Sequence, residues 1–139
     1  MIIQYLRAAI YTNGKLTVSN SKFINNSAKT HGGAIYTSNN GVVLSVENSV
    51  FYNNKVNSNG GVIYALSPSN IKNSEFIENT AVKNGGAIGV NDANIIFSKF
   101  EKNGASNGGA IIISDCITDC AFINNTATKN AGVIDNAVH

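Results

Sequence analysis

The chain is short of the residues on which most enzymes and nucleic-acid-binding proteins depend. Only 13% of its 139 residues are charged and its formal net charge is +2, so neither nucleic acid nor an acidic partner is indicated. It contains no tryptophan, a single proline and two cysteines, Cys116 and Cys120, which are too few for a disulfide scaffold. No apolar run approaches the roughly 20 residues that cross a bilayer as a helix, so no membrane span is expected.

The opening segment, residues 1–7, is too short and has the wrong charge pattern for a secretory signal. The length leaves room for one domain with one core, which we expect to cover residues 1–139. We expect this domain to be a fragment of a longer repeat protein, with an upstream segment missing; the alternative is that the chain is intracellular.

Asparagine is the residue in clearest excess, with 23 copies, and much of it belongs to a repeat. Five times a phenylalanine is followed three residues later by asparagine, in the pairs Phe23/Asn26, Phe51/Asn54, Phe76/Asn79, Phe100/Asn103 and Phe122/Asn125. Eight or nine residues after each phenylalanine stands a Gly-Gly or Ala-Gly step, followed by Ala or Val and then Ile. The phenylalanines recur every 28, 25, 24 and 22 residues, a period that marks a repeat architecture in which neighbouring units stack to bury their apolar faces.

Period-2 alternation with β-branched residues predicts short strands around these columns, and two or three strands fit into each repeat. Asn-Gly occurs six times, which is typical of hairpins. A hairpin meander does not bring like residues together, whereas a parallel solenoid places Phe over Phe and Asn over Asn at ~4.8 Å. The sequence therefore predicts an all-β, single-stranded parallel β-helix of about five coils of 22–28 residues, with phenylalanine and asparagine ladders and with glycines at corners.

Nearly all of the variation in repeat length falls between the glycines and the next phenylalanine, since the distance from phenylalanine to the glycine step is nine residues in four repeats and eight in the other. Insertions are therefore expected at one corner, around Ser38–Val42, Leu66–Ser69, Val90–Ala93 and Ser114–Cys116. In solenoids such loops gather on one face and often carry the binding role.

Three tyrosines, Tyr11, Tyr36 and Tyr64, share the column directly after the inward isoleucine and should point outward in a row. The positions that end this row are Gly89, Ile112 and Asp135. Exposed aromatic rings stack on sugar rings, and tyrosine is favoured at interfaces, so we interpret the row as a candidate ligand contact. The alternative is that the stacked rings only stabilise the coil.

No catalytic, metal or cofactor site is predicted, because the eight acidic residues are scattered along the chain and a glycosidase needs a carboxylate pair. Glu78 and Glu101 fall in neighbouring columns beside Lys102, which is typical of a solvated face. Cys120 occupies the serine column of the repeat and is interpreted as a small core residue. Extended chain would hold Cys116 too far from it for a disulfide.

Two glycosylation sequons, at Asn25 and Asn124, have little weight in a chain so rich in asparagine.

The linked Phe-x-x-Asn and Gly-Gly-(Ala/Val)-Ile signatures resemble the repeats of chlamydial polymorphic outer membrane proteins and of the archaeal and bacterial adhesin-like proteins that share them. The resemblance runs from about Arg7 to Ile134. It implies a right-handed β-helical passenger of a surface protein, located at the cell surface or outside the cell and used for attachment.

The leading functional hypothesis is therefore a non-enzymatic adhesin-type module, whose partner is a component of a host or neighbouring cell surface or a polysaccharide. One alternative is a carbohydrate-active β-helix enzyme, a polysaccharide lyase or hydrolase, or a degenerate relative of one. Another is a structural solenoid that forms homo-oligomers through its open ends, where strand edges are exposed.

Overall fold

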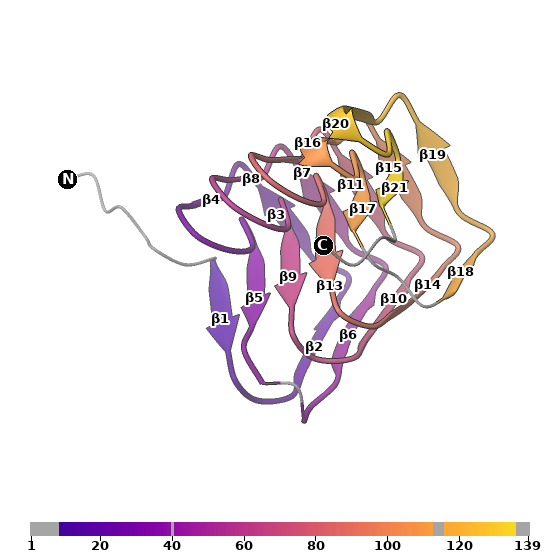
Figure 1. Ribbon diagram of the computed structural model, residues 1–139. Helices are drawn as coiled ribbons and strands as arrows, with labels where there is room; N and C mark the ends of the chain where they lie inside the picture. The colour runs from indigo at the N-terminus through magenta and orange to yellow at the C-terminus, as the bar shows by residue number, and fades with distance from the viewer. Residues whose placement is uncertain (1–8, 40, 113–115, 136–139) are drawn as a thin grey trace.

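The computed structural model describes residues 9–39, 41–112 and 116–135. In these residues the chain forms 21 short strands and no helix, and every pairing between them is parallel. Consecutive strands lie in different sheets, and each of the four sheets takes every fourth strand. The chain therefore winds through the four sheets once per coil, and the coils stack side by side along one axis (Figure 1). The predicted parallel β-helix of about five coils is confirmed.

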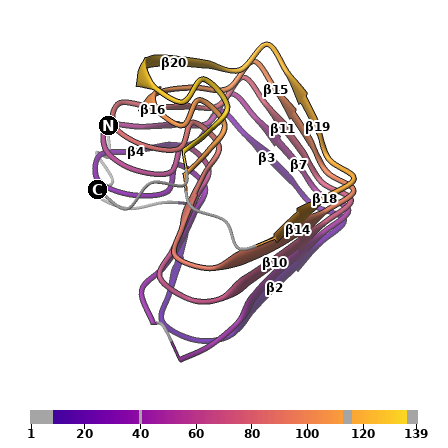
Figure 2. The ribbon, with the colours of Figure 1, turned by 45° about the vertical axis from the view of Figure 1, so that its right-hand side comes forward.

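Sheet A contains the strands that follow the glycine steps: β1 (Ile10–Thr12), β5 (Ile35–Thr37), β9 (Ile63–Ala65), β13 (Ile88–Val90), β17 (Ile111–Ile112) and β21 (Ile134–Asp135). Sheet B contains the strands after the variable corner: β2 (Leu16–Ser19), β6 (Leu44–Glu47), β10 (Ser69–Lys72), β14 (Ala93–Ile96) and β18 (Cys116–Thr118). The β2 to β18 strands form one straight side of the coil in Figure 2.

Sheet C contains the phenylalanine strands: β3 (Lys22–Ile24), β7 (Val50–Tyr52), β11 (Glu75–Ile77), β15 (Lys99–Glu101) and β19 (Ala121–Ile123). Sheet D contains β4 (Ser27–Ala28), β8 (Lys55–Val56), β12 (Thr80–Ala81), β16 (Gly104–Asn107) and β20 (Thr126–Asn130). Each coil thus has four strands, and the prediction of two or three was wrong.

Single residues in the left-handed backbone region turn two of the corners, which is why four strands fit into one repeat. Asn20 and its equivalents join sheet B to sheet C, and Asn25 and its equivalents join sheet C to sheet D; all have φ between 48° and 59°. Asparagine tolerates this conformation better than most residues. Phe97 and Glu78 adopt it as well in their coils, so the corner geometry is imposed by the stack and not by asparagine alone.

The glycine pairs form the corner between sheets D and A, for two different reasons. The first glycine of each pair has positive φ, for example 64° at Gly60. A side chain on the second, Gly61, would collide with the carbonyl oxygen of Gly86 in the next coil. The first position therefore needs glycine's backbone freedom and the second needs its small size.

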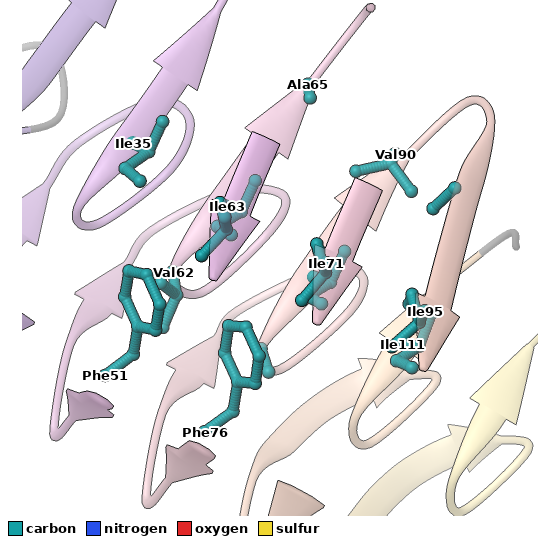
Figure 3. Packing of buried hydrophobic residues seen from close by; sticks show 14 of the residues in the cluster. Ile35, Phe51, Val62, Ile63, Ala65, Ile71, Phe76, Val90, Ile95 and Ile111 are labelled. Carbon is teal, nitrogen blue, oxygen red and sulfur yellow. The ribbon is translucent and has the colours of Figure 1, made fainter. Parts of the chain in front are cut away.

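The five phenylalanines form one continuous stack inside the solenoid. Successive ring centroids lie 4.8–5.0 Å apart with interplanar angles of 2–8°. Phe51, Phe76 and Phe100 are fully buried, and Figure 3 shows the first two pointing into the interior together with aliphatic side chains from sheets A and B. Phe23 and Phe122, at the two ends of the stack, are only half-buried.

The asparagines three residues later form a second internal ladder. In the first four of the five, the backbone N–H and the Nδ2 group donate to the Oδ1 atom of the asparagine in the next coil, at 2.9–3.0 Å. The Nδ2 groups of the last four donate back to the phenylalanine carbonyl of the preceding coil. Asn54, Asn79 and Asn103 are completely buried, and these bonds satisfy them, as buried polar groups require.

Candidate functional site

The phenylalanine and asparagine ladders lie inside the coil, so only the outer faces of the four sheets are available to a ligand. The outer face of sheet A carries the three predicted contact residues. Tyr11 pairs in register with Tyr36, and Tyr36 with Tyr64. We call these three side chains the tyrosine row. Their neighbouring ring centroids are 5.1 and 5.6 Å apart, with the planes tilted by 52° and 53°.

The tyrosine row is accessible along its whole length. Tyr11 is 42% exposed, and Tyr36 and Tyr64 are half-buried by their neighbours. A Cβ atom on Gly89, the next position of the column, would lie 3.4 Å from Cδ2 of Tyr64. The ring of Tyr64 therefore lies against the fourth coil, and the backbone of Gly60 lies still closer to the Gly89 position, at 3.2–3.3 Å.

A fourth ring, His31, joins the tyrosine row and was not predicted. Its imidazole stacks on Tyr64 at 4.3 Å with an interplanar angle of 15° and lies 5.4 Å from the ring of Tyr36. Partial burial, and secondarily the positive charge of Lys83, lowers the pKa of His31 below its ordinary value. The Nδ1 atom is buried without a hydrogen-bond partner, which also favours the neutral imidazole at pH 7.

The signal that could have revealed His31 is its place in the repeat. It pairs with Asn59, and this column continues through Asn84 and Asn107. In those coils each asparagine Nδ2 donates to the Oδ1 atom of the preceding one. His31 thus replaces an asparagine immediately before a Gly-Gly step, and its ring turns towards the tyrosine row.

A second outward row lies beside the tyrosine row. It consists of Asn13, Ser38, Leu66 and Asn91, each placed two residues after the position of the tyrosine column in its coil. Each lies directly after the end of a sheet A strand, at the turn towards sheet B. With Asn39, these four residues line an open hollow of about 460 Å³. A hydrogen bond of 3.1 Å between Tyr11 Oη and Ser38 Oγ links the two rows. We call this second set, together with Asn39, the polar row.

The polar row lies at the variable corner. The expected insertions near Ser38–Val42, Leu66–Ser69 and Val90–Ala93 fall between sheets A and B, apart from residue 40, which is outside the described residues. The fourth expected insertion is Ser114–Cys116. Its residues 114 and 115 also lie outside the described residues, and Cys116 begins β18.

Charge distinguishes this face from the others. Strands β1, β5, β9, β13 and β17 of sheet A contain no charged residue, and no charged residue is found in the part of the hollow's lining that the structure describes. The strands of the other three sheets carry charge, for example Glu47 and Lys72 in sheet B, and Lys99 and Glu101 in sheet C. Lys99 and Glu101 form an ion pair at 2.6 Å, which lowers the pKa of Glu101 and raises that of Lys99. We call the outer face of β1, β5, β9, β13 and β17, with the tyrosine row, His31 and the polar row, the tyrosine face; the positive charge of Lys83 acts on it at His31.

The acidic residues do not form a convincing catalytic pair. Glu75 and Asp119 share an open hollow of about 410 Å³ with Lys99, but they belong to coils two strand spacings apart, roughly 10 Å along the axis. Both are solvent-exposed, whereas a general acid is normally kept protonated by burial. The Glu78 backbone N–H donates to the Glu101 carbonyl at 2.9 Å, but the two carboxylates have different partners: that of Glu78 accepts from the Tyr52 hydroxyl, and that of Glu101 pairs with Lys99. Among the described residues no cluster of three His, Cys, Asp or Glu side chains could hold a metal ion.

Both cysteines are free. Cys120 takes the place of serine in its column: its thiol donates to the carbonyl of Thr118 at 3.3 Å, as the Ser98 hydroxyl donates to Ile96. Burial raises the pKa of the Cys120 thiol, which therefore stays protonated near neutral pH, while Cys116 is exposed. The sequon residues Asn25 and Asn124 are exposed at the corner between sheets C and D.

In the described part of the chain, no helix is both long and apolar enough to cross a membrane.

The family model of the Chlamydia polymorphic membrane protein repeat matches the chain three times, at residues 20–38, 48–66 and 73–91. Each match begins at the corner before sheet C, passes through sheet D and ends on a member of the polar row: Ser38, Leu66 or Asn91. Searches of curated proteins and of solved structures find no significant match. The chain is thus a parallel β-solenoid that contains three Chlamydia polymorphic membrane protein repeats, and such repeats are typical of an adhesin-like family of outer-membrane and surface proteins.

Proposed function

We propose that this chain is a non-enzymatic attachment module of a cell surface, and that it contacts its ligand through the tyrosine face. The partner is a component of a host or neighbouring cell surface or an extracellular polysaccharide. The observation that carries the proposal is the row of three tyrosines on the one sheet whose first five strands lack charge. The adhesin-like, surface-associated and generally non-enzymatic character of the repeat family supports it.

The side chains of the tyrosine face are already restrained before a ligand binds, so binding should cost little conformational entropy. Each tyrosine stands on a strand that pairs with strands on both sides or, at β1, with β5. The rings also restrain one another, since Tyr36 contacts Tyr11, Tyr64 and His31. Tyrosine provides a large contact area with few rotatable bonds, and preorganised contacts lose less entropy when a ligand binds.

The test compares two tyrosine substitutions on different faces. Beads coated with the purified chain are counted on cultured epithelial cells and on bacterial cells. The Tyr36→Ala/Tyr64→Ala double variant should bind at least about threefold fewer beads, because each lost ring removes a contact that every coated molecule contributes. Tyr52→Ala, which removes a 39% exposed tyrosine from sheet C, should leave the count unchanged.

Circular dichroism melts of all variants control for unfolding. If the folded double variant binds both cell types as well as the parent chain does, the tyrosine face is not the contact surface and the proposal fails.

A second candidate function is self-association through the coil ends, and the polarity of the asparagine ladder favours it. In the first coil Asn26 uses its donors towards Asn54, and its Oδ1 atom accepts nothing from the described residues. In the last coil Asn125 offers its backbone N–H, which has no described acceptor, while its Oδ1 atom is occupied. One end therefore supplies an acceptor and the other supplies donors, as head-to-tail stacking of two copies requires.

Multi-angle light scattering between 1 and 100 μM would test this second candidate. The mass should rise with concentration and should remain that of a monomer in a variant carrying Asn125→Asp, because the introduced carboxylate would oppose the Oδ1 acceptor of the partner's Asn26. A constant monomer mass for the parent chain would reject self-association.

A further inference from the structure

We infer that the ligand of the tyrosine face is an uncharged polysaccharide, bound along the coil axis over the tyrosine row with its hydroxyl groups in the hollow of the polar row. The inference rests on the proposed function and adds the chemical class of the ligand and the direction in which it lies.

The two rows provide the two kinds of contact that a pyranose ring needs. A sugar has apolar C–H faces, which pack on aromatic rings, and a rim of hydroxyl groups, which donate and accept hydrogen bonds. The amides of Asn13 and Asn91 carry both donors and acceptors, and so does the hydroxyl of Ser38. Because these side chains line an open hollow directly beside the rings, one sugar unit can use both rows at once.

The described lining of the hollow has no charged side chain, which favours a neutral ligand over an anionic one. Among the described residues, no lysine, arginine, aspartate or glutamate lines the hollow, and none occurs in β1, β5, β9, β13 or β17. An anionic glycan bound in the hollow would lose hydration of its carboxylate or sulfate groups and gain no ion pair from the described lining residues in return. Lysines such as Lys55 in sheet D and Lys72 in sheet B lie on other faces, where a polyanion would bind instead.

The hollow also favours an extended chain over a single sugar. Its lining residues come from four successive coils, and the ring-to-ring distances of 5.1 and 5.6 Å follow the coil repeat. A polymer that lies along the axis therefore meets similar contacts several times. Each contact is weak by itself, so the affinity should rise with the number of sugar units until the site is filled.

An extended peptide is a poorer candidate for this face. Peptides bind sheets most often by adding a strand at an open edge, with main-chain hydrogen bonds giving the affinity. The backbone groups of the inner strands β5, β9, β13 and β17 are already paired with both neighbouring strands. A peptide lying across the face would have side-chain contacts alone.

Isothermal titration calorimetry with neutral oligosaccharides of two and six units, from the cellulose, xylan and mannan series, tests the inference. Heparin and polygalacturonate serve as anionic probes. At least one neutral series should bind, more tightly as six units than as two. Its dissociation constant should change less than about twofold between 0.15 and 1 M NaCl, because no ion pair is screened. Tyr36→Ala should weaken binding about tenfold or more, and Asn91→Ala about threefold.

The matched control is Tyr52→Ala, which should bind as the parent chain does. Tyr11→Ala, at the exposed end of the row, provides a second aromatic variant if Tyr36→Ala lowers the melting temperature. Failure of every neutral oligosaccharide to bind would overturn the inference, and so would binding of the anionic probes alone or equal effects of Tyr36→Ala and Tyr52→Ala.

Periodate treatment of the target cells distinguishes this inference from the proposed function, because periodate cleaves the vicinal diols of sugars and spares the peptide backbone. Attachment that is sensitive to Tyr36→Ala/Tyr64→Ala and lost after periodate supports both. Attachment that is sensitive to the double variant but survives periodate retains the proposed function and rejects the glycan ligand.

Discussion

The interior and the outer positions of the repeat differ in how strictly the same residue type recurs from coil to coil. Inside, the phenylalanine and asparagine columns are identical in all five coils. Outside, the column that follows each phenylalanine changes freely, through Ile24, Tyr52, Ile77, Glu101 and Ile123. An interior side chain must fit against its equivalents at the strand spacing, whereas an outer side chain meets water. The repeat therefore specifies the fold, and function has to be sought where outer columns form a consistent surface, as the tyrosine row does.

The largest effect is expected from a substitution that interrupts the phenylalanine stack in the interior. Phe76→Ala removes a ring that is sandwiched between Phe51 and Phe100 at 4.8 Å on both sides. We expect it to lower the free energy of unfolding by about 3–5 kcal/mol, measured by urea denaturation, because the neighbouring coils cannot close the cavity without giving up their own pairing. The outer-face control, Ile123→Ala, should cost far less. Similar losses in the two variants would contradict the distinction between interior and surface.

A smaller effect is expected from the asparagine ladder. Asn79→Ala leaves the Asn54 amide donors without their acceptor and the Phe51 carbonyl without its donor. Unsatisfied buried groups should destabilise the fold by at least about 2 kcal/mol. The matched control is Asn70→Ala on the exposed face of sheet B, which should stay within about 0.5 kcal/mol of the parent. A near-neutral Asn79→Ala would mean that the ladder is not a source of stability.

The smallest effect is expected at His31, which occupies a column that holds asparagine in the following coils. It concerns how the stability of the fold depends on pH. Because the pKa of His31 is lowered in the folded chain, the unfolded chain binds the proton first as the pH falls. The stabilising effect of the neutral ring is present above the unfolded pKa of about 6.5 and is lost as the pH falls through the folded pKa. Urea denaturation at pH 7.5 and at pH 5 should show a smaller loss for His31→Asn than for the parent chain. Equal losses would remove His31 as the cause.

Much of the architecture could be predicted because the repeat columns record which residues stack. Identity of the Phe, Asn and Gly columns indicated parallel coils, and the structure confirms them. The number of strands could not be predicted in the same way, because strands of two or three residues have no period of their own. The left-handed corner residues were missed for a related reason: Glu78 and Phe97 have no local preference for positive φ and take it only because the coil must turn there.

The tyrosine column was visible in the sequence, but the site around it was not. Period-2 alternation indicates that Tyr36 points outward, and nothing in that pattern brings His31 to within 5.4 Å of its ring. The polar row was hidden as well, because Asn13, Ser38, Leu66 and Asn91 share no residue type. They line the same hollow only because each of them directly follows a strand of sheet A.

The sequence by itself determined which residues lie above one another, since a repeated side chain at fixed spacing can satisfy its own equivalents only when the coils run parallel and in register. The tertiary structure alone decided how many flat faces each coil has, where the left-handed corners fall and which outward columns meet. Those features depend on how the whole coil closes around its core. The length of a loop and the close approach of a glycine to the neighbouring coil therefore affect where the side chains of the tyrosine face lie.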